Sequence, residues 1–131
     1  MLKKLCATLL ISAGAAAVAS SAGAHHSAAM FDPNKEVTLT GTVIEFQWTN
    51  PHAWIEMMAT DEAGKPVQWS VELDGPNALF RQGWKPRTIK PGDRVVIVAH
   101  PLRDGRPGGS YVSIALPDGQ RLGRPPGRGA L

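Results

Sequence analysis

Short stretches in which apolar and polar residues alternate are the feature that most restricts the fold of this chain. The clearest stretch covers residues 67–73, where every second residue is apolar: Val67, Trp69, Val71 and Leu73. A period of two places such residues on one face of a β-strand, whereas a helix needs a period near 3.6. Residues 37–43 alternate in the same way, and residues 95–99 form a continuous apolar run typical of a strand covered on both faces. The pattern predicts an all-β domain.

The order of the expected strands and helix indicates which all-β architecture the chain adopts. Strands are expected over residues 37–48, 52–60, 67–73, 95–99 and 111–116, with turn-forming residues between them. A short helix is expected to begin at Pro76 and to end near Gly83, between the third and fourth strands. This order predicts a five-stranded OB-like Greek-key barrel, and an open β-sandwich fragment is the alternative.

The first strand is expected to bend. Its apolar positions change phase after Val43, to Ile44, Phe46 and Trp48. Such a change usually marks a β-bulge, and Gly41 would ease the bend because it has no side chain.

Residues 1–24 have the three-part layout of a secretory signal peptide. Lys3 and Lys4 precede an apolar run over residues 5–18, and Ala22-Gly23-Ala24 supplies the small residues that a signal peptidase reads. We therefore expect signal peptidase to remove this segment and the chain to be periplasmic. No stable membrane anchor is expected, because the run is shorter than the roughly 20 residues that span a bilayer. Cys6 is the only cysteine, so the mature chain is expected to form no disulfide.

Composition divides the remaining chain into three parts. Residues 25–36 lack a clear period and are expected to form an extended N-terminal segment with a turn at Asp32-Pro33-Asn34. Residues 37–117 would form the barrel, and residues 118–131, rich in Gly, Pro and Arg, are expected to be a disordered tail. The net charge of +3 comes from the two ends, since residues 25–119 hold 9 basic and 11 acidic side chains. A nucleic-acid partner is therefore not expected.

The four histidines all lie after the expected signal peptide: His25, His26, His52 and His100. Cleavage after Ala24 would give His25 a free amine beside its imidazole, and a third nitrogen from His52 or His100 would complete a T-shaped copper site. Cleavage after Ala22 would instead allow an amine, two amides and the His25 ring to surround Cu(II) in a square plane. The competing interpretation is that His25 and His26 are solvated residues of a chain end. Copper is the one cofactor that the sequence suggests.

The segment Trp48–Trp54 places His52 and a proline-containing turn between two tryptophans. It joins strands one and two of the expected barrel, and His100 begins the loop between strands four and five; these loops flank the binding surface of such barrels. The alternative to copper is a metal-free module that holds a periplasmic protein or a small ligand through Trp48, Asn50 and Trp54, with both tryptophans exposed as one apolar patch. The sequence contains no nucleophile elbow and no phosphate-binding glycine loop, so an enzyme is not expected.

Several motifs together resemble a known family. They are His25-His26-Ser27 before Met30-Phe31-Asp32, Leu39-Thr40-Gly41-Thr42-Val43, Thr49-Asn50-Pro51-His52-Ala53, Leu73-Asp74-Gly75-Pro76, Lys90-Pro91-Gly92-Asp93 and Leu102-Arg103-Asp104-Gly105. Over about residues 25–119 the chain resembles the domain-of-unknown-function 6152 family (DUF6152), small exported bacterial proteins. The resemblance implies export from a bacterial cell and a small β-fold, and it implies no activity.

Overall fold

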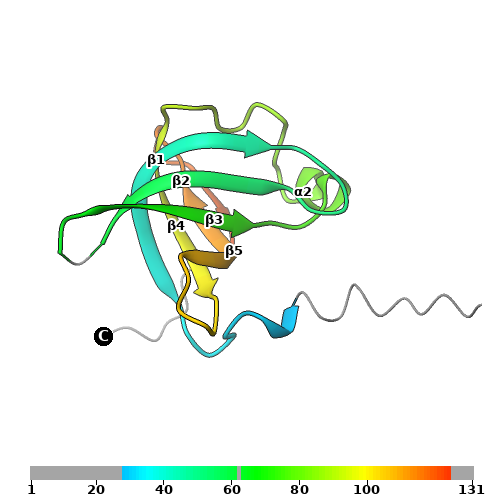
Figure 1. The fold of residues 1–131 in the computed structure, drawn as a ribbon. Coiled ribbons are helices and arrows are strands. Elements are labelled where there is room, and N and C mark those ends of the chain that lie inside the picture. Colours follow the sequence, from blue (N-terminus) through cyan, green and yellow to red (C-terminus); the bar gives the residue numbers. More distant parts are fainter. Residues whose placement is uncertain (1–27, 62, 125–131) are drawn as a thin grey trace, which may run out of the picture.

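The computed structural model describes residues 28–61 and 63–124, whose strands wrap into a closed barrel (Figure 1). The elements in chain order are β1 (Val37–Gln47), β2 (Trp54–Thr60), β3 (Pro66–Glu72), α2 (Pro76–Arg81), β4 (Arg94–Pro101), β5 (Gly108–Ala115) and β6 (Arg121–Gly123). The strands follow the order β3-β2-β1-β4-β5-β6. A parallel pairing of residues 70–72 in β3 with residues 108–110 in β5 closes the sheet. The closed barrel with one helix between β3 and β4 confirms the OB-like prediction and excludes the open sandwich.

The bend in β1 is built as the sequence predicts. Val43 pairs with Met57 and Glu45 pairs with Glu56, which leaves Ile44 as the extra residue of a bulge. Ile44 is 41% exposed, so it does not join the interior as its apolar side chain suggested. Gly41 allows the close approach of β2, since a Cβ there would lie 2.0 Å from the carbonyl oxygen of Met58. The bulge and the glycine let one long strand pair with β4 in its first half and with β2 in its second.

The interior is apolar, and α2 packs against it through Leu79. Trp84 is its largest fully buried side chain, with ring centroids 5.6 Å from Phe46 and 5.5 Å from Tyr111. The indole N–H of Trp84 and the hydroxyl of Tyr111 are buried without a hydrogen-bond partner among the described residues. Burial raises the pKa of Tyr111 to about 12.

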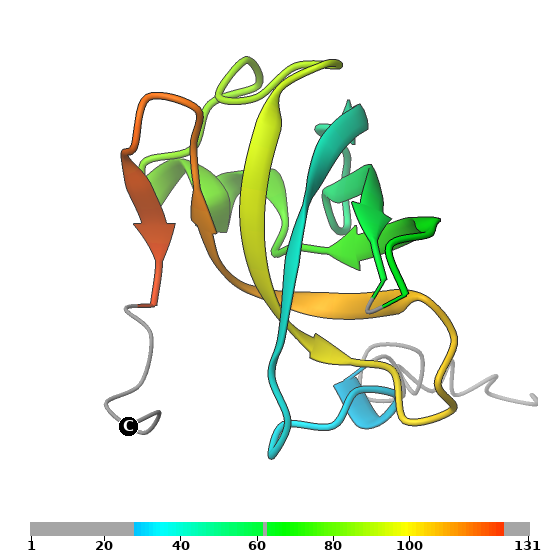
Figure 2. The ribbon, with the colours of Figure 1, turned by 90° about the vertical axis from the view of Figure 1, so that its left-hand side faces the viewer.

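The C-terminal part corrects one expectation. Residues 118–131 were expected to be disordered, but Arg121–Gly123 form β6, which pairs with β5 along the edge seen in Figure 2. Gly119, with a φ of 86°, makes the tight turn that brings this strand back. Leu122 then packs against the core, and one apolar side chain is too weak a pattern to read from sequence. Residues 125–131 lie outside the described residues.

The N-terminal segment also differs from expectation at its start. Residues 28–30 form a helical turn rather than an extended chain, with the amide of Phe31 donating to the carbonyl of Ala28 at 3.4 Å. The expected turn at 32–34 is present, because the carboxylate of Asp32 accepts the amide of Asn34 at 3.1 Å. We call residues 28–36 the lead-in. The expected signal peptide and residues His25 and His26 lie outside the described residues. Within the described part of the chain, no helix is long and apolar enough to cross a membrane.

Candidate ligand site on the outer face of the barrel

A pocket of about 360 Å³ lies where the lead-in passes the outer face of β2, β3 and β5. We call it the outer pocket. Its lining residues come from the lead-in, from three strands and from the loop between β4 and β5: Met30, Phe31, Trp54, Ser70, Leu102, Arg106, Pro107, Gly108 and Gly109. The β2–β3 face and the neighbouring loops are where barrels of this fold hold their ligands. The fold therefore places an apolar concavity at its usual binding position.

The walls of the pocket follow from strand alternation. Ile55 points into the core and is fully buried, so Trp54 before it points outward and is half-buried. Phe31, only 7% exposed, closes the opposite side. Gly108 forms part of the floor, because a Cβ there would lie 2.7 Å from the Leu102 side chain. The sequence thus creates a space bounded by an indole, a phenyl ring and bare backbone.

Two of the residues that line this apolar pocket, Ser70 and Arg106, carry polar side chains that can form hydrogen bonds. The hydroxyl of Ser70 donates to Oε1 of Glu56 at 2.6 Å, which leaves its oxygen lone pairs as acceptors. Arg106 uses its Nε to donate to Oδ2 of Asp104 at 2.7 Å, and its terminal nitrogens carry further N–H donors. The pocket therefore offers stacking surface together with a hydroxyl and a guanidinium.

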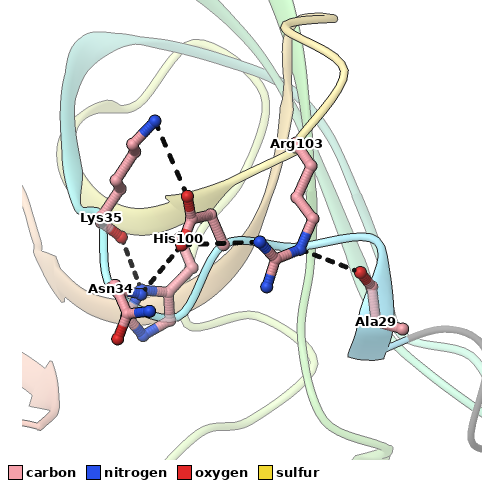
Figure 3. Close-up of polar contacts among 6 residues, drawn as sticks. Ala29, Asn34, Lys35, His100 and Arg103 are labelled. Carbon is pink, nitrogen blue, oxygen red and sulfur yellow. Dashed lines mark hydrogen bonds and ion pairs between the residues drawn. The ribbon is translucent and has the colours of Figure 1, made fainter.

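The lead-in is fastened to the loop after β4 by backbone and side-chain contacts (Figure 3). The amide of Arg103 donates to the carbonyl of Met30 at 2.9 Å, and its Nε donates to the carbonyl of Ala29 at 3.2 Å. The amide of Asp32 donates to the carbonyl of Pro101 at 2.9 Å. These bonds hold Met30 and Phe31 in place as one wall of the outer pocket.

His100 belongs to this fastening. Its Nδ1 lies 2.7 Å from the carbonyl oxygen of Lys35, and because a carbonyl only accepts, Nδ1 carries the hydrogen (Figure 3). The Asp32 carboxylate lies between two cations, 3.7 Å from Nζ of Lys35 and 3.9 Å from Nη1 of Arg103. His100 therefore has a structural partner on one ring nitrogen, and Nε2 has no hydrogen-bond partner within the described residues.

His52 is held in the same way from a different element. Its Nδ1 donates to the carboxylate of Glu72, whose side chain is 8% exposed, while the His52 side chain is 41% exposed. Glu72 pairs with Trp54 across β2 and β3, so His52 lies at one end of the face that carries the outer pocket. A buried carboxylate that fixes Nδ1 leaves Nε2 as the nitrogen available to a ligand.

The structure does not gather the predicted metal ligands into one group. Within residues 28–61 and 63–124, no three His, Cys, Asp or Glu side chains converge closely enough to hold a metal ion. His52 is held by Glu72 and His100 by Lys35, on separate elements. The other two predicted ligands, His25 and His26, lie outside the described residues.

The predicted aromatic loop is divided between two faces. Trp48 follows Phe46 inward, with ring centroids 5.8 Å apart, and packs against the core. Trp54 faces outward into the outer pocket, so the two tryptophans do not form the single apolar patch that was expected. Side chains alternate between the two faces along each strand, and the turn between β1 and β2 restarts this alternation. Trp48 and Trp54 therefore lie on different faces. Asn50 is exposed in that turn and does not line the pocket.

Sequence reasoning missed most of the pocket lining. Met30, Phe31, Ser70 and Arg106 belong to segments that were expected to be a plain lead-in, a strand face and a hairpin loop. The isolated apolar pair Met30-Phe31 in an otherwise polar stretch was the available signal. The loop between β4 and β5 contributes Leu102, Arg106 and Pro107 to the lining.

Comparison with known proteins concerns the fold and the family. No curated protein sequence matches the chain. Among solved structures, the mitochondrial single-stranded DNA-binding protein Rim1 of S. cerevisiae is similar, with a TM-score of 0.45 and 12% identity over 63% of this chain and 93% of that one. The profile of the family of unknown function DUF6152 matches residues 13–111. This match covers most of the sequence and agrees with its motifs, and the protein therefore belongs to the family of unknown function DUF6152.

Proposed function

We propose that this protein is an exported, periplasmic binding protein that holds a small ligand in the outer pocket. The observation that carries the proposal is an indole-walled concavity of about 360 Å³ at the position where OB-like barrels bind. Pockets of about this size, mostly apolar with a few placed polar groups, are typical of small-molecule sites. Export is proposed from the signal-peptide pattern of residues 1–24.

The lining defines a class of ligand. Trp54, Phe31 and Leu102 offer flat and apolar surface, which suits an aromatic or similarly planar body. Arg106 and Ser70 add a guanidinium and a hydroxyl to the lining. A planar apolar ligand with an acidic or hydrogen-bonding edge fits both features. The protein then acts by binding rather than by catalysis.

The experiment uses 1-naphthoate as a planar acidic probe and 1-naphthol as its uncharged counterpart. We expect saturable naphthoate binding, observed by NMR as shifts of the Trp54 indole N–H and of the Gly108 and Gly109 amides. Trp54→Ala should weaken binding at least about tenfold, equivalent to about 1.4 kcal/mol. Arg106→Ala should weaken naphthoate binding more than naphthol binding.

The matched control is Met58→Ala, which removes a 38% exposed side chain from the same face of β2 outside the pocket. It should leave the affinity for naphthoate unchanged. Shifts confined to other faces, or equal affinity of wild type and the Trp54 variant, would contradict the proposal.

Copper binding through a processed N-terminus is a second candidate function. It is favoured by the way His52 and His100 are held, since ligating histidines usually donate their other ring N–H to a carboxylate or a backbone carbonyl. The lead-in is fastened from Ala29 onward. His25 precedes Ala28 by three positions in the sequence, so its amine would stay within about 10 Å of that residue. The amine and ring of His25 would then chelate Cu(II) near the barrel.

Calorimetry of the processed chain against Cu(II) tests this candidate. His52→Ala and His100→Ala identify which internal histidine supplies the third nitrogen, and His26→Ala tests the second terminal imidazole. A chain extended by one residue before His25 should lose most of the affinity, because the amine would no longer belong to that histidine. Unchanged affinity in the extended chain would contradict the free-amine arrangement.

A further inference from the structure

Ser70 is the hydroxyl-bearing residue in the lining of the outer pocket, and its hydrogen is already engaged. The neighbouring Val71 is fully buried in the core, so Ser70 projects from the outer face of β3. Its Oγ lies 2.6 Å from Oε1 of Glu56. Because a carboxylate accepts hydrogen bonds and has no hydrogen to give, the hydroxyl is the donor in this contact. Ser70 therefore offers a ligand only the lone pairs of its oxygen.

Glu56 is placed so that it keeps the Ser70 hydroxyl in this orientation. The two residues lie opposite each other where β2 pairs with β3, and side chains at such positions have Cβ atoms about 5 Å apart. The other carboxylate oxygen of Glu56, Oε2, has a second partner on β3, since it lies 3.4 Å from Nε2 of Gln68. Glu56 is not among the described residues that line the outer pocket. It therefore affects a ligand through Ser70, as a positioning residue.

The charges at the outer pocket distinguish two parts of a ligand. At Ser70, an N–H or O–H of the ligand would be attracted by the hydroxyl oxygen and by the neighbouring Glu56 carboxylate, and a carbonyl or carboxylate oxygen would be repelled by both. At Arg106 the reverse holds, because its terminal nitrogens are positively charged donors. Arg106 is the one cation among the described residues of the lining. A ligand that suits both therefore carries an acidic group for Arg106 and a separate hydrogen-bond donor for Ser70.

We propose that Ser70, oriented by Glu56, selects planar acids that also carry an N–H or O–H donor. The inference rests on the ligand site proposed above and narrows its ligand to aromatic acids with a ring N–H, an amino group or a hydroxyl group. Ser70 is the residue that determines this specificity. An analogue in which an oxygen replaces the donor leaves the Ser70 oxygen without a partner and brings two acceptors together, and both effects cost affinity.

The test compares two probes of nearly the same shape, indole-3-carboxylate and benzofuran-3-carboxylate, in which a ring oxygen replaces the ring N–H. The corresponding 2-carboxylates form a second pair, with the donor closer to the acidic group. Titration calorimetry of the full chain measures the four affinities. We expect the wild-type chain to bind the N–H member of at least one pair about tenfold more tightly than the oxygen member.

Three variants trace this preference to its source. Ser70→Ala should remove it, because the acceptor is gone. Glu56→Ala should bring the ratio of affinities close to that of Ser70→Ala, because the Ser70 hydroxyl is then free to donate to the benzofuran oxygen. Thr42→Val removes a hydroxyl from β1 outside the pocket and should keep the full preference. Circular dichroism checks that each variant is folded.

Binding of 1-naphthoate, which has no donor, separates this inference from the proposed function. If 1-naphthoate binds and neither pair shows a preference in the wild-type chain, the selection by Ser70 is wrong and the ligand site stands. If neither 1-naphthoate nor any indole or benzofuran probe binds, the ligand site and the selection are both wrong. A preference that persists in Ser70→Ala or in Glu56→Ala also overturns the inference, because the donor would then be recognised by another group.

Discussion

The interior of the barrel and the outer pocket are made by the same strands, yet they differ in what holds them. Inward positions of β2 and β3, such as Ile55 and Val71, are fully buried in the hydrophobic core. Outward positions on the same strands carry Trp54, Ser70 and Glu72, of which Ser70 is paired with Glu56 and Glu72 with His52. Hydrophobic burial is non-directional, whereas hydrogen bonds are directional and each contributes little net stability.

The comparison shows that stability and binding draw on opposite faces of one sheet. Substitutions inside should therefore change the free energy of unfolding and leave ligand contacts intact, and substitutions outside should do the reverse. Variants on the two faces test this separation of stability from binding, and Trp84 is expected to give the largest effect.

Trp84→Ala should give the largest loss. The side chain is fully buried between Phe46 and Tyr111, and removing such an aromatic leaves a cavity that costs about 3–5 kcal/mol. Urea unfolding followed by circular dichroism measures the change. Trp54→Ala is the matched control and should cost about 1 kcal/mol or less while abolishing most probe binding. Equal losses in the two variants would contradict the separation of the faces.

Alkaline pH should destabilise the fold through Tyr111. Its pKa is about 12 in the folded chain against 10.0 for the ordinary side chain, because burial favours the neutral hydroxyl. The stability that the neutral Tyr111 hydroxyl contributes is fully present below pH 10 and is lost as pH rises toward 12. The reason is that the tyrosine of the unfolded chain releases its proton at a lower pH than that of the folded chain. The expected loss over this window is about 2 kcal/mol, measured by urea unfolding at several pH values.

Tyr111→Phe is the control for that effect and should remove most of the alkaline dependence. The hydroxyl has no hydrogen-bond partner among the described residues, so its removal strands no donor or acceptor. Stability at pH 7 should therefore stay the same or rise by up to about 1 kcal/mol. A clear loss at pH 7 would show that the hydroxyl has a partner in solution.

His52 and Glu72 should be coupled. Their contact joins an exposed loop to a buried carboxylate, and a double-mutant cycle with His52→Ala and Glu72→Gln should give a coupling energy of about 1 kcal/mol. Unfolding free energies of the four proteins at pH 7 measure it. Glu56→Gln combined with His52→Ala is the comparison pair and should be additive, because Glu56 bonds Ser70 rather than His52. Additivity in the Glu72 cycle would contradict a positioning role for that carboxylate.

Arg103→Ala should have the smallest effect on stability, below about 1 kcal/mol, because its side chain is largely exposed. Its effect on the outer pocket should be larger, since Arg103 fastens Ala29 beside the wall residue Met30. We expect faster amide exchange at Asp32 and weaker naphthoate binding. Arg87→Ala, an exposed arginine in the connector after α2, should change neither.

The sequence predicted the fold much better than the site. The alternation in residues 67–73, the phase change near Ile44 and the helix after Gly75 depend on neighbours in the chain, and all three are found. The outer pocket depends instead on residues from four separate segments, among them Phe31, Ser70 and Arg106. No pattern within any one of these segments predicts that they lie together in the folded chain.

The chain by itself determined which residues turn inward, because the side-chain period of a strand is fixed by backbone geometry. That was enough to specify a closed all-β barrel with a short helix. Only the tertiary structure decided that Trp48 packs inside while Trp54 faces the outer pocket, and that β6 forms from a glycine-rich tail. It also decided that Glu72 is the partner of His52 and that the Lys35 carbonyl is the partner of His100. These outcomes arise from contacts between segments that are separate in the sequence, so no local pattern specifies them.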